Sequence, residues 1–195
     1  ISRPVSLVVT DPLRIEPFGI HVWNDQNISQ ERAQIHIRSE IKNYAASDTD
    51  FTLRTTLLDP RGTPLFVHEE NAQLGAGEST LLEFTSAEID NPLLWSPDQP
   101  HLHSLHSELF VGGNLVDRTV TQTGIRWIEW PDLNGPEGQP LRINGQPFFI
   151  NGVADYEHVL GESHAFSEQQ IQTRVGQIQA AGFNAFRDAH HPHNL

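Results

Sequence analysis

Apolar and polar residues alternate along the first two thirds of this chain. In residues 35–42, Ile35, Ile37 and Ile41 fall on one face of the expected strand. Residues 51–57 repeat the pattern with Phe51, Leu53 and Leu57 on the apolar side. A period of two is typical of a strand that buries one face and exposes the other to water. Short strands at this spacing predict an immunoglobulin-like β-sandwich. Further candidate strands lie between turn-forming glycines and asparagines, at residues 64–70, 79–84, 105–111 and 115–121.

The pattern changes after residue 130. Residues 131–140 hold three prolines and two glycines without an apolar period, a composition typical of a linker. Residues 141–150 then predict a hairpin on an Asn144-Gly145 turn. The nearly continuous apolar segment 148–153 predicts a strand that is covered on both faces, as in a (β/α)₈ barrel.

A helix with clear end signals follows this segment. Ser167 and Gln170 form a capping box at its start, and Gly182 provides its C-terminal stop. Its apolar stripe consists of Ile171, Val175 and Ile178. Residues 183–186 predict the next strand. A strand, a helix and a strand of these lengths predict a parallel pair joined by a right-handed crossover.

The predicted fold class is mainly β. Residues 1–130 form an immunoglobulin-like β-sandwich, residues 131–140 form a linker, and residues 141–195 form an incomplete βαβ piece of a TIM barrel. One βα unit and its next strand cannot bury their own apolar faces, so we expect the chain to be a fragment of a larger enzyme. A bare apolar patch of roughly several hundred Å² seldom persists on a soluble monomer. Residues 141–195 are therefore expected to pack back on the sandwich or to self-associate.

Charge and composition narrow the classes of partner. The chain carries 12 Lys+Arg against 25 Asp+Glu, a formal net charge of -13. This balance argues against binding to nucleic acid or to an anionic membrane surface, since both require clustered cations. Cysteine is absent, which excludes a disulfide framework, a thiolate nucleophile and a Cys-ligated zinc. The sequence shows neither an apolar run long enough to span a bilayer nor a signal peptide.

Candidate chemistry lies where the two predicted barrel strands end. Reactive groups of a (β/α)₈ barrel occupy the C-terminal ends of its strands. Arg187 can hold a carboxylate ionised through a bidentate pair, and His190 can donate to a substrate hydroxyl or orient a carboxylate. Asp155 and Glu157 alternate on the first strand and resemble a paired-carboxylate site. The alternative is a network of structural ion pairs, with these carboxylates bound to Arg187 or to another barrel arginine.

Histidines and Trp95 suggest further sites that are less specific. The cluster of His158, His164, His190, His191 and His193 matches no zinc motif of fixed spacing, so no metal site is predicted. Trp95 is expected to pack in a loop against the sandwich, with a sugar-stacking platform as the alternative. The remaining histidines lie in β segments and are mostly expected at the surface: His21, His36, His68, His101, His103 and His106.

Four segments together resemble glycoside hydrolase family 2. They are Leu94–Leu102 (LWSPDQPHL), Gly124–Arg126 (GIR), Ile143–Val153 (INGQPFFINGV) and Phe183–Pro192 (FNAFRDAHHP). In that family a jelly-roll domain precedes an immunoglobulin-like sandwich and a (β/α)₈ barrel. The resemblance spans nearly the whole chain and implies that the chain holds the sandwich and the first part of the barrel.

The resemblance also assigns roles to individual residues. Arg187 matches the family arginine that contacts the nucleophile, and His190 matches a histidine that lines the sugar subsite. Glu157 and His158 match the family's ending of the first barrel strand. Residues Ala154-Asp155-Tyr156 stand where many β-galactosidases have Asn-Arg-His, which indicates a divergent subgroup. The substrate-binding residues implied in this way are Asp155, Tyr156, Glu157, His158, Arg187 and His190.

The predicted function follows from this resemblance. Family members are retaining β-glycosidases that use two glutamates on the fourth and seventh barrel strands, which lie outside this chain. The full-length protein is expected to hydrolyse terminal β-glycosides, with β-galactosides as the leading substrates, while the chain alone is expected to be inactive. No cofactor is implied, and a divalent metal in the full-length protein stays open. The substrate class favours a periplasmic or secreted location.

Two alternatives to an active glycosidase stay open. The chain could instead serve as a non-catalytic carbohydrate-binding or structural sandwich module, because most of it is β-sandwich. A degenerate full-length protein that has lost its glutamates is the other alternative.

Overall fold

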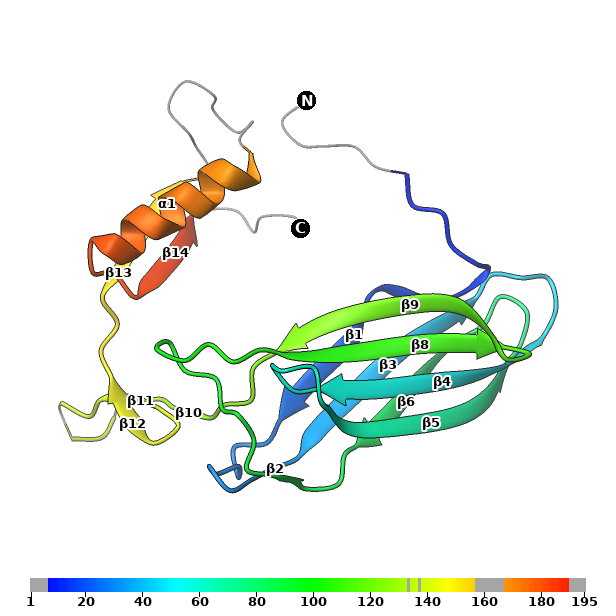
Figure 1. Cartoon of the computed structure of the whole chain (residues 1–195), viewed down its shortest axis with the longest axis horizontal. Helices are drawn as coiled ribbons and strands as arrows, with labels where there is room; N and C mark the ends of the chain where they lie inside the picture. The colour runs from blue at the N-terminus through cyan, green and yellow to red at the C-terminus, as the bar shows by residue number, and fades with distance from the viewer. Residues whose placement is uncertain (1–6, 133, 137, 157–166, 190–195) are drawn as a thin grey trace. The chain divides into compact units, whose positions relative to one another are not determined.

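A computed structural model describes residues 7–132, 134–136, 138–156 and 167–189 (Figure 1). The chain divides into two compact units. One comprises Val9–Pro147, and the other contains the described residues from Phe148 onward. The two units are described separately below.

Antiparallel strands of the first unit form two main sheets (Figure 1). The first sheet has the order β1-β3-β6 and the second has the order β5-β4-β8-β9. This arrangement confirms the predicted sandwich. The strands of the two sheets are β1 (Leu13–Asn24), β3 (Ile35–Asn43), β4 (Thr49–Leu58), β5 (Pro64–Leu74), β6 (Ser79–Thr85), β8 (His103–Val111) and β9 (Asn114–Thr123), and a short pair is formed by β2 (Arg32–Ala33) and β7 (Ile89–Asp90).

The core between the sheets is apolar and comes from the alternating segments. Every second residue of β3 is buried, and so is every second residue of β4 from Phe51 to Leu57, as the period of two predicts. Leu57 of β4 lies opposite Leu105 of β8, and both side chains are 0% exposed. Each such leucine contributes about 1.5–3 kcal/mol relative to an exposed one. Apolar packing therefore holds this sandwich together without a disulfide.

One buried polar side chain at the end of β3 ties the β3–β4 loop to the end of β5. Asn43 is 0% exposed, and its amide donates to the carbonyl oxygens of Ser47 at 2.9 Å and Leu74 at 3.1 Å. Its side-chain oxygen accepts from the backbone N–H of Ala45 at 2.9 Å. These bonds satisfy an amide that would otherwise be costly to bury.

A small third sheet connects the sandwich to the rest of the chain. Strands β10 (Ile128–Glu129), β11 (Leu141–Ile143) and β12 (Gln146–Phe148) lie in that order. The predicted hairpin is confirmed, with positive φ at Asn144 (52°) and Gly145 (75°), as a tight hairpin turn requires. The Asn144 side chain also accepts from the Trp127 N–H and donates to the Trp95 carbonyl oxygen. These bonds hold the hairpin in the same compact unit as the sandwich, although the sequence pattern assigns it to the barrel portion.

The second unit contains a parallel strand pair and one helix. Strands β13 (Gly152–Tyr156) and β14 (Ala185–Ala189) pair in parallel, and α1 (Glu168–Ala180) lies between them in the chain (Figure 1). The predicted βαβ order is confirmed. Within the described part of the chain, no helix is both long and apolar enough to cross a membrane.

The expected strand boundaries of this unit were wrong. β13 begins at Gly152 instead of residue 148, and β14 begins at Ala185 instead of residue 183. Just before the two strands, hydrogen bonds from a side chain take the place of backbone pairing between strands. The Asn184 side chain accepts from the Asn151 backbone N–H at 2.8 Å and donates to the Phe149 carbonyl oxygen at 2.8 Å.

The ends of α1 follow the sequence signals closely. Ser167 is the N-cap, and its capping box with Gln170 is present. At the other end, Gly182 has a φ of 86°, and its N–H donates to the Gln179 carbonyl oxygen. The Phe183 N–H donates to the carbonyl oxygen of Ile178, five residues earlier. This pair of bonds is a Schellman motif, which stops the helix at the predicted glycine.

Candidate functional site

The first candidate site lies at the C-terminal ends of β13 and β14. The register pairs Ala154 with Arg187 and Asp155 with Asp188, so the two strand ends meet at one edge. Successive residues of a strand point to opposite faces of the sheet. Arg187 and Asp155 therefore lie on opposite faces and do not form one cluster.

Asp155 lies on the face covered by α1. Its Oδ2 is 2.8 Å from Nη1 of Arg174 in the helix, and the side chains are 36% and 39% exposed. This ion pair ties the helix to the strand. An ion pair as exposed as this one contributes at most about 1 kcal/mol. The sequence suggested that Asp155 pairs either with Arg187 or with another arginine of the barrel. In the structure its partner is Arg174 of the helix.

Arg187 occupies the face that α1 leaves uncovered. Its side chain is exposed and forms no ion pair with any residue that the structure describes. A guanidinium in this position can offer two parallel N–H donors to a carboxylate.

The other predicted substrate contacts are placed only in part. Tyr156 is the last residue of β13, and its backbone pairs with Ala189. Glu157, His158 and His190 lie outside the described residues, as do His164, His191 and His193. Among the residues that are described, no group of three or more His, Cys, Asp or Glu side chains could hold a metal ion.

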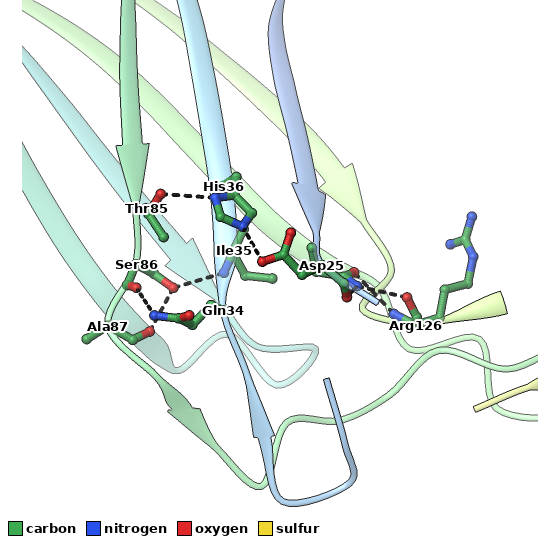
Figure 2. Close-up of polar contacts among 9 residues, drawn as sticks. Asp25, Gln34, Ile35, His36, Thr85, Ser86, Ala87 and Arg126 are labelled. Atoms are coloured by element: carbon green, nitrogen blue, oxygen red, sulfur yellow. Dashed lines mark hydrogen bonds and ion pairs between the residues drawn. The ribbon is translucent and has the colours of Figure 1, made fainter. Parts of the chain in front are cut away.

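A second polar cluster, which the sequence did not reveal, lies at one end of the sandwich (Figure 2). His36 Nε2 is 3.1 Å from Asp25 Oδ2, and His36 Nδ1 is 3.0 Å from Thr85 Oγ1. The ring of His36 also stacks on Trp23, with centroids 5.3 Å apart. Cross-strand pairing brings these residues together, because Trp23 of β1 lies opposite His36 of β3 and His36 lies opposite Thr85 of β6.

Trp95 packs within the first unit, as expected. Its backbone N–H donates to the Ile125 carbonyl oxygen at 2.8 Å, and Cζ of the Arg126 guanidinium lies 4.6 Å from the centroid of its ring. A Cβ added to Gly124 would come within 2.8 Å of the Trp95 side chain. The lack of a side chain at Gly124 therefore allows the Trp95 side chain to approach the backbone this closely. Arg126, next to this contact, lines a cleft of about 450 Å³ together with Trp23 and Trp130.

Comparison with known families identifies the chain. The family model described as Glycosyl hydrolases family 2 matches residues 14–126, and the model for the TIM barrel domain of the same family matches residues 137–195. The chain belongs to glycoside hydrolase family 2. The first match covers most of the sandwich, and the second covers the hairpin and the βαβ piece.

Proteins similar to this chain include enzymes named beta-galactosidase and enzymes named beta-glucuronidase. A beta-galactosidase from Pseudoalteromonas haloplanktis is 28% identical over 100% of this chain and 18% of its own length. A beta-glucuronidase from Paenibacillus borealis is 26% identical over 99% of this chain and 28% of its own length. The chain thus spans only 18% to 28% of the length of these relatives.

Solved structures show the same fold. Bacteroides uniformis beta-glucuronidase 2 matches 95% of this chain and 22% of its own chain, with a TM-score of 0.87 and 23% identity. A family-2 member from Bacteroides cellulosilyticus matches 94% of this chain and 23% of its own chain, with a TM-score of 0.82 and 25% identity. The sandwich followed by the start of a barrel is therefore the arrangement of family 2.

Proposed function

We propose that this chain supplies the sandwich and the first part of the catalytic barrel of a retaining exo-β-glycosidase. The observation that carries the proposal is the position of Arg187. It stands on the second parallel strand of the barrel piece, near the C-terminal edge and on the face that α1 does not cover. In a (β/α)₈ barrel that face is directed inward, and that edge carries the substrate site.

The chemistry of Arg187 suits a role beside a catalytic carboxylate. Retaining glycosidases attack the sugar with one carboxylate while a second acts as acid and base, the two lying about 5 Å apart. The nucleophile must be ionised when it attacks. A guanidinium that binds it through two N–H groups favours the ionised form and fixes its orientation. The two glutamates implied by the family belong to later barrel strands.

For the sugar, we propose a terminal β-galactoside. The beta-galactosidase of Pseudoalteromonas haloplanktis matches the full chain and supports this choice. A β-glucuronide is the second candidate, supported by the similarly matched protein of Paenibacillus borealis. Tyr156 stands at the strand ending where many of the family's galactosidases differ from this chain, so this position is proposed to influence the choice of sugar, whereas Asp155 is held by Arg174 on the face that α1 covers.

The test replaces Arg187 in the full-length enzyme. Turnover is measured with chromogenic β-galactoside, β-glucuronide and β-mannoside for the wild type, R187A and R187K. We expect R187A to lower kcat by about a hundredfold or more, the range seen when one donor to a reacting charge is removed. R187K keeps the charge but loses the paired donors, so it should recover only part of the activity.

A matched control is R61A, which removes an exposed arginine from the turn between β4 and β5. It should leave turnover unchanged. Near-normal activity of R187A would refute the proposed role. Absence of activity in the wild type on all three sugars would favour a non-catalytic carbohydrate-binding or structural module.

A further inference from the structure

We propose that the cleft beside Arg126 at the end of the sandwich binds a sugar that carries a carboxylate, such as a hexuronate residue. This cleft lies wholly within the first unit and is distinct from the strand ends that carry Arg187. The proposed site does not depend on the proposed glycosidase activity, because none of its residues belongs to the barrel piece.

The first argument is the unpaired charge of Arg126. Six described arginines of this acidic chain form ion pairs with carboxylates: Arg14, Arg32, Arg38, Arg54, Arg118 and Arg174. Arg126 is half-buried and has no carboxylate partner among the described residues. Its guanidinium instead lies over the Trp95 ring, with Cζ 4.6 Å from the ring centroid, and the guanidinium edge carries N–H donors that no described carboxylate binds. Such an edge is suited to two parallel bonds with a carboxylate.

The second argument is that the cleft is held in shape before any ligand arrives. The side-chain amide of Asn24 donates to the Arg126 carbonyl oxygen at 2.9 Å, and its oxygen accepts from the Arg126 backbone N–H at 3.4 Å. Two residues further on, the Gln26 side chain accepts from the Ile128 N–H at 3.3 Å. The backbone on which Arg126 stands is therefore tied to the end of β1, and little conformational freedom remains to be lost on binding.

Trp23, which lines the same cleft, is held in a similar way. Its ring stacks on His36, whose Nδ1 is hydrogen-bonded to Thr85 Oγ1 and whose Nε2 lies 3.1 Å from Asp25 Oδ2 (Figure 2). On its own strand the Trp23 ring also lies against His21, with centroids 4.6 Å apart. This network fixes the indole as one wall of the cleft.

The third argument is the chemistry of the remaining walls. Trp130 lines the cleft and is 71% exposed, so its indole ring is open to a ligand. Indole rings present flat apolar faces that can cover the C–H groups of a sugar ring. Gln122 also lines the cleft, and its amide donates to Ser104 Oγ at 2.8 Å, which leaves its carbonyl oxygen to accept from a hydroxyl. A volume of about 450 Å³ lies within the range of small-molecule sites.

The site is tested by calorimetric titration of the 195-residue chain with methyl β-D-glucuronide and methyl β-D-glucoside. The two probes differ only at the carboxylate. We expect the glucuronide to bind at least tenfold more tightly, with an affinity that weakens as salt is raised. R126Q should abolish this preference, R126K should retain only part of it, and W130A should weaken both probes. The control R187Q should bind both probes as the wild type does.

Several results would overturn the proposal. They are equal affinities for the two probes, no binding of the glucuronide, and an undiminished preference in R126Q. Circular dichroism of R126Q and W130A establishes that each variant is folded before its titration is interpreted. A preference for a short acidic peptide over the glucuronide would instead make the cleft a protein contact. Because the readout is binding and not turnover, an inactive full-length enzyme would not affect the result.

Discussion

His103 is expected to make the sandwich sensitive to acid. It lies at the start of β8, is 0% exposed, and neither of its ring nitrogens has a hydrogen-bond partner within the described structure. Burial lowers the pKa of His103 below its ordinary value of 6.5, and the nearby carboxylate of Asp59 opposes this shift only in part. Lowering the pKa favours the neutral imidazole in the folded protein more than in the unfolded chain. We predict that replacing His103 by leucine removes one source of acid instability.

The sign and size of the effect follow from proton linkage. A group whose pKa is lowered in the folded state stabilises the fold above its unfolded pKa, and this contribution is lost as the pH falls. For His103 the loss begins near pH 6.5. The largest possible effect, about 1.4 kcal/mol of lost unfolding free energy between pH 7.5 and 5.5, corresponds to an imidazole that binds no proton in the fold over this range while the unfolded chain does. The H103L variant lacks this contribution.

The assay is urea unfolding followed by tryptophan fluorescence at several values of pH. All four tryptophans lie in the Val9–Pro147 unit, so the signal reports on the sandwich. The difference in free energy of unfolding between H103L and the wild type should shift in favour of H103L by up to about 1.4 kcal/mol between pH 7.5 and 5.5. H21Q, which removes a histidine at an exposed position, is the control and should run parallel to the wild type. If the free energy of unfolding changes with pH by the same amount in H103L and in the wild type, the reasoning is refuted.

Three further predictions concern stability and association. N43A should lower the free energy of unfolding of the sandwich by about 3 kcal/mol, because it removes three hydrogen bonds of about 1 kcal/mol each from a buried site; a loss below about 1 kcal/mol in urea unfolding would contradict this. G182A should destabilise the second unit by about 1–2 kcal/mol, since a φ of 86° is unfavourable for any residue with a Cβ; the loss of helical circular dichroism on heating measures it, and an unchanged midpoint would count against it. The 195-residue chain should self-associate in light scattering as its concentration rises, because Ile171 and Val175 of α1 are 46% and 48% exposed. V175E should shift the chain toward the monomer, and a wild type that is monomeric at all concentrations would disprove the prediction.

Local patterns in the sequence predicted the secondary structure well where the signal was itself local. The alternation of residues 35–42 and 51–57 identified β3 and β4, and Ser167 with Gly182 marked the two ends of α1. These signals depend on a strand period, a cap and a backbone angle, which a short stretch of residues specifies without distant partners.

Strand boundaries in the barrel piece were predicted less well. The apolar run from residue 148 does not show where pairing begins, because the start of β13 depends on bonds between residues more than thirty positions apart. The Asn184 side chain bonds to the backbone of Phe149 and Asn151 and keeps this part of the run out of the strand. No window along the chain contains both partners.

The sequence by itself determined the sandwich and the βαβ order, because both follow from periodicity and turn chemistry, and its resemblance to family 2 suggested the role proposed for Arg187. Only the tertiary structure separated Asp155 from Arg187, by pairing β13 with β14 and placing Arg174 of the helix against Asp155. It alone buried His103 and brought Asn24 to Arg126 across 102 positions of sequence. A strand pattern specifies which side chains share a face, whereas the partners that meet them are decided by the pairing of strands that are far apart in the chain.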